Sequence, residues 1–363
     1  MSIYFIVLLV AVIAAAASTA LVPSASPAIA TQVEAAASGR KYIRWSPLDP
    51  LIVIGLIAFS ALRFRVGTDY EMYWRFYQIA DPAGNWSDQI VFFKQDAGYT
   101  ILALLTKSIS ADPFAIFWVT SALTVIPIYI VLRRESQDLA FSVLLYICLA
   151  FYVAPFNGVR QGIAVALCFW AYSFAGRRWL TFALLGGLAV AFHASAVIAI
   201  GGYLLIRKWK PTFVTAAIVL IASAALSAVM WSVPAVTNLL GALNARYEGY
   251  ATRGLESGTG TYLTILFFLG LALCCLALRK HTDRSDWLAM VIASVLPLVV
   301  ATQVVEAARL SAYFAIFNIL LIPNIMQDMK KPGFLKFAIV AVSVVYFYMY
   351  LGNFGDLIPY QTY

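Results

Sequence analysis

Charged side chains are scarce in this chain of 363 residues. Asp, Glu, Lys and Arg make up 12% of it, against roughly a quarter in soluble domains, and 63% of the residues are hydrophobic. So little polar surface cannot cover a water-soluble globule. The composition excludes a soluble enzyme, gives no reason to expect a nucleic-acid partner, and predicts an all-α polytopic membrane protein with one integral membrane domain over residues 1–363.

Metal-binding and redox residues are also few. The chain has two histidines, and its four cysteines lie inside apolar runs without metal-ligand spacing to either histidine. These cysteines are interpreted as small hydrophobic residues of helices. We therefore expect no metal and no cofactor.

Long apolar runs, in contrast, are abundant. A run of about 20 residues crosses the hydrocarbon core of a bilayer as a helix. The stretch between Arg178 and Arg207 is too long for one span, so we interpret it as a hairpin of two short helices that turns at 192–195. With it, about twelve transmembrane helices are predicted, the others near 2–20, 49–63, 113–132, 139–154, 160–175, 211–231, 262–278, 286–303, 308–326 and 334–351.

The basic residues orient these spans. In a twelve-span arrangement, sixteen of the 25 Lys and Arg residues fall in loops on one side, which the positive-inside rule identifies as the cytoplasm. Both termini then lie outside, and the first run is a span rather than a signal peptide. Residues 97–110 cannot be a span without inverting every later loop, so they are predicted to form an amphipathic or re-entrant helix on the outer face. The main extracytoplasmic loops are 63–112 and 232–261.

Nine basic residues remain on the outer side, and seven of them are arginine. Topology signals need only charge, whereas the planar guanidinium group binds phosphate or carboxylate at two points. The set therefore suggests an anionic ligand, although single arginines can also extend toward lipid headgroups. Its members are Arg63, Arg65, Arg75, Lys94, Lys107, Arg160, Arg246, Arg253 and Arg309.

Arg160 is the strongest case. With Gln161 it opens a helix whose N-terminus points outward, where free N–H groups and the helix dipole favour an anion. A cation at the positive end of the helix dipole is unfavourable unless an anion is present, so a bound anionic ligand is the favoured explanation. The alternative explanation is that Arg160 pairs with an internal carboxylate. Arg309 repeats the arrangement with Tyr313 one turn below, but there Glu306 is an obvious internal partner.

His193 lies at the turn of the short hairpin, beside Ser195. Each arm has about thirteen residues, so the turn reaches only about 20 Å and stays below the outer membrane surface. Irregular backbone at that depth requires protein or a water-filled cavity around it. His193 is therefore a candidate proton acceptor or a hydrogen-bond donor to a phosphate. Alternatively, it is a structural residue whose hydrogen bonds hold the turn.

The outer stretch RFRVGTDYEMYW, residues 63–74, begins the first large loop. Asp69 or the threonine before it is a good helix N-cap, and aromatic residues then follow at the spacing of one helix face. Tyr70 and Tyr73 on that face could be a stacking floor for sugars or part of an interfacial aromatic belt. The D-x-E formed with Glu71 is only a weak metal signal.

Five motifs in this order resemble the EpsG family of Wzy-like polymerases of bacterial exopolysaccharide and O-antigen. They are R-x-R-V-G-T-D-Y-x-x-Y from Arg63, D-A-G-Y at 96–99, N-x-x-R-Q-G-I-A at 157–164, F-H-A-S-A at 192–196 and R-x-x-x-Y-F at 309–314. The family usually has glutamate where Asp96 precedes Ala97 and Gly98, so the carboxylate is kept but shortened.

The resemblance implies a glycosyltransferase that joins oligosaccharide repeat units carried on undecaprenyl diphosphate, at the outer face of the bacterial inner membrane, without a metal. A flippase and a chain-length regulator are the implied partners. In this interpretation Asp69 and His193 are the candidate catalytic bases. The implied diphosphate ligands are Arg63, Arg65, Arg160, Gln161 and Arg309. The implied glycan-binding or supporting residues are Tyr70, Tyr73, Asp96, Asn157, Ser195, Arg246 and Tyr313.

Three other functions fit part of the pattern. A ligase that transfers finished glycan uses the same donor, and a glycosyltransferase using a lipid-monophosphate sugar would bind similar groups. A transporter or flippase for the same lipid belongs to a different class, and it predicts charges at mid-membrane and inverted repeats. No convincing repeat is visible in the chain.

Overall fold

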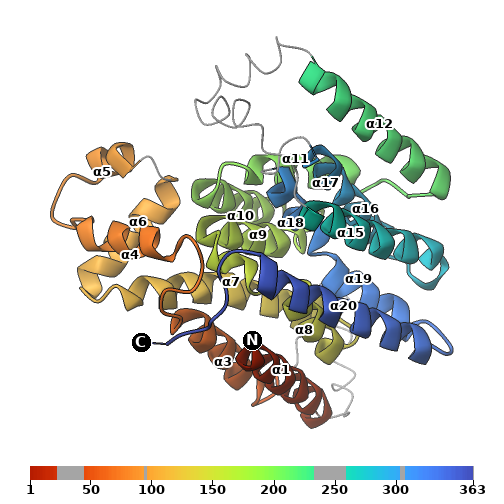
Figure 1. The fold of residues 1–363 in the computed structure, drawn as a ribbon, viewed down its shortest axis with the longest axis horizontal. Coiled ribbons are helices and arrows are strands. Elements are labelled where there is room, and N and C mark those ends of the chain that lie inside the picture. Colours follow the sequence, from red (N-terminus) through yellow and green to blue (C-terminus); the bar gives the residue numbers. More distant parts are fainter. Residues whose placement is uncertain (23–44, 94–95, 233–258, 303–306, 363) are drawn as a thin grey trace. The chain divides into compact units, whose positions relative to one another are not determined.

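The computed structural model describes residues 1–22, 45–93, 96–232, 259–302 and 307–362, and these are almost entirely helical (Figure 1). By their contacts they divide into two compact units. Unit 1 comprises Met1–Val197 and Lys331–Tyr363, and unit 2 comprises Ile198–Lys330. That the whole chain is one membrane domain stays a prediction.

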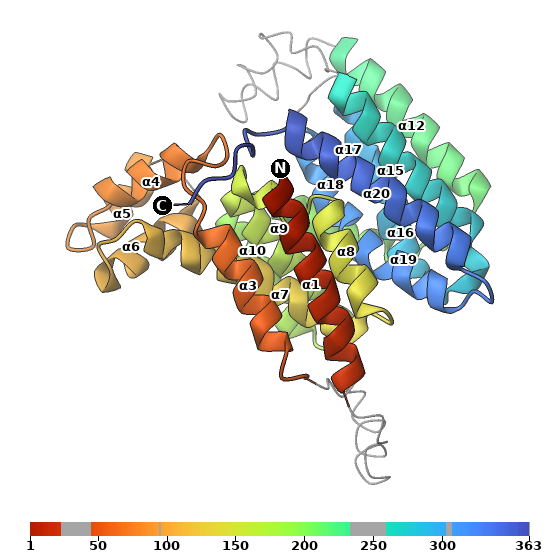
Figure 2. The same cartoon turned by 60° about the horizontal axis from the view of Figure 1, so that its bottom comes forward.

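Unit 1 contains the helices that begin and end the chain. Helix α1 packs against α3 and α8, α3 against α7, α7 against α9, α9 against α10, and α20 against α8. The smaller helices α4, α5 and α6 form a group joined to this bundle through contacts of α6 with α7 and α10 (Figures 1 and 2). Its helices are α1 (Ser2–Leu21), α3 (Asp49–Ala61), α4 (Tyr70–Ile79), α5 (Trp86–Phe93), α6 (Ala97–Ile109), α7 (Phe114–Glu135), α8 (Leu139–Cys148), η1 (Ala154–Phe156), α9 (Val159–Tyr172), α10 (Trp179–Phe192) and α20 (Gly333–Asn353), with α11 (Ala196–Ile206) crossing the unit boundary.

In unit 2, α17 packs against α12, α15 and α18, and α16 packs against α18 and α19. The Tyr203 hydroxyl on α11 donates to the Tyr313 carbonyl oxygen at 2.6 Å, and Ser311 donates to the Ser294 carbonyl at 2.7 Å. The helices of this unit are α12 (Phe213–Ser232), α15 (Thr259–Ala277), η2 (Arg279–His281), α16 (Ser285–Ala293), α17 (Val295–Val300), α18 (Ala308–Ala315) and α19 (Asn318–Gln327).

All twelve predicted apolar segments contain helix, and the hairpin turns where it was predicted, between α10 and α11. Three segments are less regular than expected. The segment 139–154 leaves the α-helix after Cys148, and the segments 286–303 and 308–326 are each divided into two helices. Residues 97–110 form helix α6, although its position at the membrane surface stays a prediction.

Among the described residues, five helical segments are long and apolar enough to cross a membrane: Ser2–Leu21, Phe114–Glu135, Gly260–Ala277, Ala308–Gln327 and Gly333–Asn353. Shorter apolar helices of 10–17 residues accompany them. At 1.5 Å per residue these shorter helices span less than the full hydrocarbon thickness. The chain is thus a multi-pass membrane protein, and the number of twelve crossings stays a prediction.

The contacts at the two ends of α3 show where the chain termini lie in unit 1. At the start of α3 the buried Asp49 accepts hydrogen bonds from Ser18 at 2.6 Å and Tyr129 at 2.7 Å, and forms a 3.0 Å ion pair with Arg133. At the other end of α3, the Tyr4 hydroxyl donates to the Leu357 carbonyl at 2.7 Å. Tyr4 and Leu357, which are close to the two termini, therefore lie together at the end of this unit opposite Arg133, and the orientation of the spans in a membrane stays a prediction.

Candidate active site

Four side chains from four helices meet at the end of unit 1 that carries the termini. Asp96 Oδ2 lies 2.7 Å from a terminal nitrogen of Arg160 and 4.0 Å from Nδ1 of His193. The Arg160 guanidinium also hydrogen-bonds the Tyr73 phenol. We call these four residues the Asp96 cluster. It combines a carboxylate, a guanidinium, an imidazole and a phenol, which are the groups needed to bind an anion and accept a proton.

Helix ends bring the cluster together. Asp96 is the N-cap residue of α6 but makes no side-chain capping bond, Arg160 lies in the first turn of α9, and His193 is the C-cap residue of α10. Gly98 allows the approach of α6 to α10, because a Cβ there would lie 2.8 Å from the carbonyl of Ala191. The glycine of the D-A-G-Y motif therefore places Asp96 beside the F-H-A-S-A turn.

The cluster is half-buried, so part of each of its charged side chains reaches the surface. The side chains of Arg160, Asp96 and His193 are 18%, 21% and 32% exposed, whereas Tyr73 is buried. Burial raises the pKa of the Tyr73 phenol, and the Arg160 guanidinium opposes that rise. At neutral pH Tyr73 is therefore a neutral hydroxyl group, which leaves Asp96 and His193 as the possible proton acceptors of the cluster.

This geometry corrects the view of Arg160 drawn from the sequence. An external anion was favoured there over an internal carboxylate, but Arg160 has an internal partner, Asp96, 64 positions before it in the chain. No local spacing signals such a pair. The contact does not exclude phosphate binding, because a phosphate can compete for the same guanidinium group. Phosphate binding by Arg160 stays a prediction.

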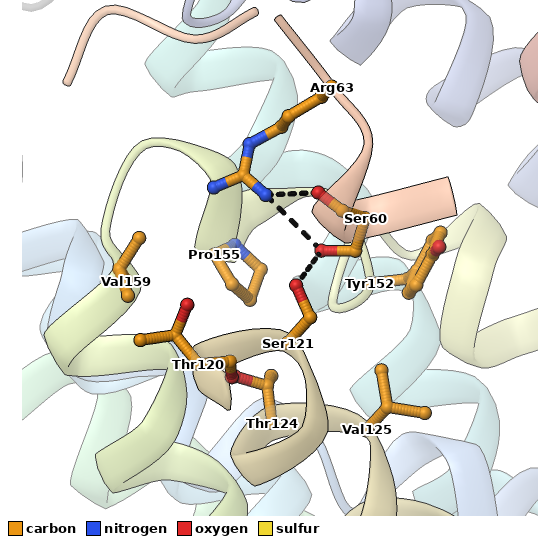
Figure 3. Close-up of a pocket in the computed structure, with 9 residues that line it drawn as sticks. All are labelled: Ser60, Arg63, Thr120, Ser121, Thr124, Val125, Tyr152, Pro155 and Val159. Carbon is orange, nitrogen blue, oxygen red and sulfur yellow. Dashed lines mark hydrogen bonds between the residues drawn. The ribbon is translucent and has the colours of Figure 1, made fainter. Parts of the chain in front are cut away.

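Arg63 does not lie on an open surface as the sequence suggested. Its residue is 2% exposed, and its guanidinium carbon lies 4.5 Å from the ring centre of Phe156 and 5.0 Å from that of Phe117. One terminal nitrogen donates to the Ser60 carbonyl and lies 3.4 Å from the Ser60 hydroxyl, which bonds Ser121 (Figure 3). Burial lowers the pKa of Arg63 to about 10, so it remains a cation at neutral pH.

The pocket beside Arg63 is too small for a sugar or a diphosphate. The cavity has a volume of about 10 Å³, which is enough for one water molecule. Figure 3 shows the side chains around it: Ser60, Arg63, Thr120, Ser121, Thr124, Val125, Tyr152, Pro155 and Val159. Arg63 is therefore a structural residue in this conformation.

The C-terminal tail after α20 covers this region, a contact that the apolar pattern of the sequence does not predict. Phe64 N–H donates to the Gln361 carbonyl at 2.8 Å, and Tyr360 stacks on Phe59 with ring centres 4.3 Å apart. Gly67 N–H donates to the Asp356 carbonyl at 3.1 Å. The only signal in the sequence was the polar, glycine-containing stretch that follows the last apolar run.

Asn157 joins the 63–69 loop to the start of α9. Its side-chain oxygen accepts a hydrogen bond from the Thr68 N–H at 2.7 Å. Gly67 has a φ of +99°, and a Cβ there would lie 2.7 Å from the same oxygen. Gly67 therefore fits both a left-handed backbone and a close contact. Asn157 thus ties two of the motifs together, and its glycan-binding or supporting role at the site stays a prediction.

Arg65 and Glu71, in contrast, are exposed. They form a 3.1 Å ion pair with side chains 66% and 47% accessible. Such an exposed pair contributes little to stability, so a ligand can compete for Arg65 at low cost. Asp69 is the N-cap residue of α4, as predicted, although its side chain makes no capping bond. The part of the chain that is described contains no group of three or more His, Cys, Asp and Glu placed for a metal.

Tyr70 and Tyr73 face the protein rather than an open groove. They are 1% and 3% exposed; Tyr70 stacks on Phe117 with ring centres 4.6 Å apart, and Tyr73 packs on Tyr99 at 5.1 Å. The aromatic stripe therefore packs α4 against α6 and α7. Sugar stacking on these rings would require α4 to move, and a glycan-binding role stays a prediction.

The remaining predicted residues are spread over the chain. Gln161 and Ser195 belong to unit 1, next to Arg160 and near His193 in the sequence. Arg309 and Tyr313 belong to unit 2, so their place in the site stays a prediction. Arg246 and Glu306 lie outside the described residues.

The two arginines of the 63–69 loop give a matched test of burial against binding. Arg63→Ala is expected to lower the free energy of unfolding by about 2 kcal/mol, because it removes a charged hydrogen bond and two cation–π contacts. Arg65→Ala should leave stability within about 0.5 kcal/mol. Thermal unfolding in detergent measures both. Equal stability losses, or none for Arg63→Ala, would contradict the structural assignment of Arg63.

Comparison with protein families decides the classification. The sequence profile of the EpsG family matches residues 48–362, nearly the whole chain and including all five motifs. The chain belongs to the EpsG family. EpsG proteins are Wzy-like polymerases, which confirms the resemblance. Searches of curated proteins and of solved structures gave no match. The family also implies a lipid-linked oligosaccharide substrate in a membrane.

Proposed function

We propose that this EpsG protein joins oligosaccharide repeat units carried on undecaprenyl diphosphate, at the outer face of the bacterial inner membrane. The observation that carries the proposal is the Asp96 cluster, which combines an arginine with two proton acceptors, Asp96 and His193, at one end of a helical bundle. This end also carries both termini, and it lies opposite the basic residue Arg133. The positive-inside rule makes it the outer end.

The reaction needs two charge movements. The hydroxyl oxygen of the acceptor sugar attacks the anomeric carbon of the growing glycan, and the bond from that carbon to the donor's diphosphate breaks. The leaving lipid diphosphate gains negative charge, which a preorganised guanidinium stabilises. The hydroxyl proton passes to a base. Arg160 takes the first role and His193 the second, with Asp69 as the other candidate base and Arg65, Gln161 and Arg309 as further diphosphate ligands.

No protein metal is required by this scheme, because the guanidinium carries the positive charge. Purified protein in detergent or vesicles should therefore lengthen a lipid-linked repeat unit in the presence of EDTA. Loss of activity in EDTA that added Mg²⁺ or Mn²⁺ restores would contradict the metal-independent mechanism. It would instead favour a metal-dependent glycosyltransferase.

The glycan that accumulates in cells lacking the gene distinguishes a polymerase from a ligase and from a flippase. Cells that lack the gene but retain the partner flippase and chain-length regulator should accumulate lipid-linked single repeats at the outer face. A ligase predicts long unattached chains in the same cells, and a flippase predicts single repeats retained at the inner face. Electrophoresis of the glycan and enzymatic labelling of outer-face sugars separate the three outcomes. Long chains or inner-face repeats would each contradict the proposal.

A further inference from the structure

Asp96 has two neighbours that compete for one oxygen atom. Its Oδ2 accepts from Arg160 at 2.7 Å and lies 4.0 Å from Nδ1 of His193, which is beyond hydrogen-bond distance. To reach Nδ1 at about 2.8 Å the oxygen must move by about 1.2 Å, which side-chain rotation provides. Asp96 makes no side-chain capping bond to α6, so no helix N–H holds the carboxylate in its present position.

A bound diphosphate changes this competition. Phosphate oxygens carry more charge than a carboxylate and match the donor fork of arginine, so a diphosphate displaces Asp96 from Arg160. The displaced carboxylate is 21% exposed, and a half-buried charge without a partner is costly. His193 offers the partner that remains within reach.

We propose that Asp96 is a positioning residue that exchanges partners, from Arg160 in the free protein to Nδ1 of His193 when a lipid diphosphate binds Arg160. This inference rests on the proposed function. In the second state Asp96 accepts the Nδ1–H hydrogen bond, so Nε2 of the imidazole is unprotonated and faces the acceptor hydroxyl. Donor binding thereby prepares the base.

The step is balanced without any further reactant. The hydroxyl oxygen of the acceptor forms its bond to the anomeric carbon, and the hydroxyl proton moves to Nε2 of His193. The electron pair of the broken carbon–oxygen bond leaves on the lipid diphosphate, which Arg160 holds. Asp96 stabilises the imidazolium that results, as a carboxylate beside an imidazole does in other enzymes.

Of the charged groups among the described residues, Asp96 at the start of α6 approaches Nδ1 of His193, and Arg160 on α9 approaches the same carboxylate. Tyr73 on α4 bonds Arg160 and remains neutral, because burial raises the pKa of its phenol. In the free protein the Asp96 carboxylate is neutralised by Arg160. When diphosphate takes Arg160, the negative charge of Asp96 is no longer neutralised there, and it stabilises the imidazolium that forms when Nε2 accepts the hydroxyl proton.

Kinetics of the full-length protein on lipid-linked repeats give the first test. Asp96→Asn should lower kcat at least about 10-fold and move the acidic limb of the pH–rate profile to lower pH. The KM for the donor should stay equal or fall, because no carboxylate competes for Arg160. Asp96→Glu keeps the carboxylate and should retain most of kcat. A raised donor KM with unchanged pH profile would show that Asp96 only holds Arg160 in place, and would overturn the proposal.

A second test does not depend on polymerisation. The chain has two histidines, so the His281→Gln variant leaves His193 as the only imidazole signal in an NMR spectrum of labelled protein. Inorganic diphosphate should raise the titration midpoint of His193 and populate its Nδ1-protonated tautomer. The added Asp96→Asn substitution should remove the tautomer shift.

The two tests separate the two ideas. If the NMR response appears but the protein joins no repeats, the partner exchange stands and the proposed function fails. If repeats are joined but diphosphate leaves the His193 signal unchanged, or changes it equally with and without the Asp96 carboxylate, the exchange is wrong and the polymerase assignment stands.

Discussion

Arg160→Gln is expected to reduce polymerisation by about 10²–10³-fold, because a preorganised donor that stabilises developing charge contributes that much to a rate. Cells carrying this variant should accumulate lipid-linked single repeats, as cells lacking the gene would. Arg160→Lys keeps the charge but loses the donor fork, so it should fall between Arg160→Gln and wild type. The measurement is the ratio of polymer to single repeat, normalised to the amount of protein in the membrane.

The control must separate binding from folding, because Arg160 also neutralises the half-buried Asp96. The double variant Arg160→Gln with Asp96→Asn removes both charges together and leaves no unpaired carboxylate. It should regain the thermal stability of wild type but not its activity. Arg75→Gln, at an exposed arginine of α4, controls for the loss of one positive charge elsewhere on the helices that surround the cluster. Normal chain length in Arg160→Gln cells with intact protein levels would contradict the assignment of Arg160.

The positions of the helices could be predicted because apolar runs of fixed length have few other structures in a membrane. The hairpin at 192–195 followed from the length of its apolar run, whereas the orientation inferred from the loop arginines and lysines stays a prediction. Helix interruptions were less predictable. The break at Ser294 lies in a continuous apolar run, and its one local signal is Pro297, which has no N–H to bond the carbonyl at the end of α16.

The site was predictable as a set of motifs and not as a set of contacts. The order of the motifs identified Asp96, Asn157, Arg160 and His193, but pairing depends on approaches between residues far apart in the chain. The approach of α6 to α10 depends on Gly98, and that of α9 to the preceding turn depends on Gly162, where a Cβ would lie 2.6 Å from Pro155. A glycine in a motif shows that something comes close, but not what does.

Arg63 shows the opposite failure. It stands two residues before Arg65, at the same end of the same loop, and the sequence treats the two alike. Their surroundings distinguish them: the Arg63 guanidinium packs on Phe117 and Phe156 and its backbone pairs with Thr362 of the tail, whereas Arg65 is exposed. A segment that follows the last apolar run without a periodic pattern gives no sign of where it packs.

His193→Gln is the second substitution with a large expected effect. If His193 is the base, its removal should lower kcat by about 10²–10⁴-fold, the usual contribution of a general base, with little change in donor KM. Asp69→Asn should then have a smaller effect, since Asp69 is the N-cap residue of α4 and is not one of the four residues of the Asp96 cluster. His281→Gln is the matched control, because it removes the other imidazole from η2 in unit 2.

The pH dependence separates the two candidate bases. An imidazole base must be neutral to accept the hydroxyl proton, so activity should fall as the pH drops through the imidazole range, near about 6.5. A carboxylate base stays ionised until about pH 4, so the same activity would persist through pH 6. If Asp69→Asn abolishes polymerisation while His193→Gln retains it, and the acidic limb lies in the carboxylate range, then the base is Asp69. In that case the exchange of Asp96 between Arg160 and His193 has no catalytic role.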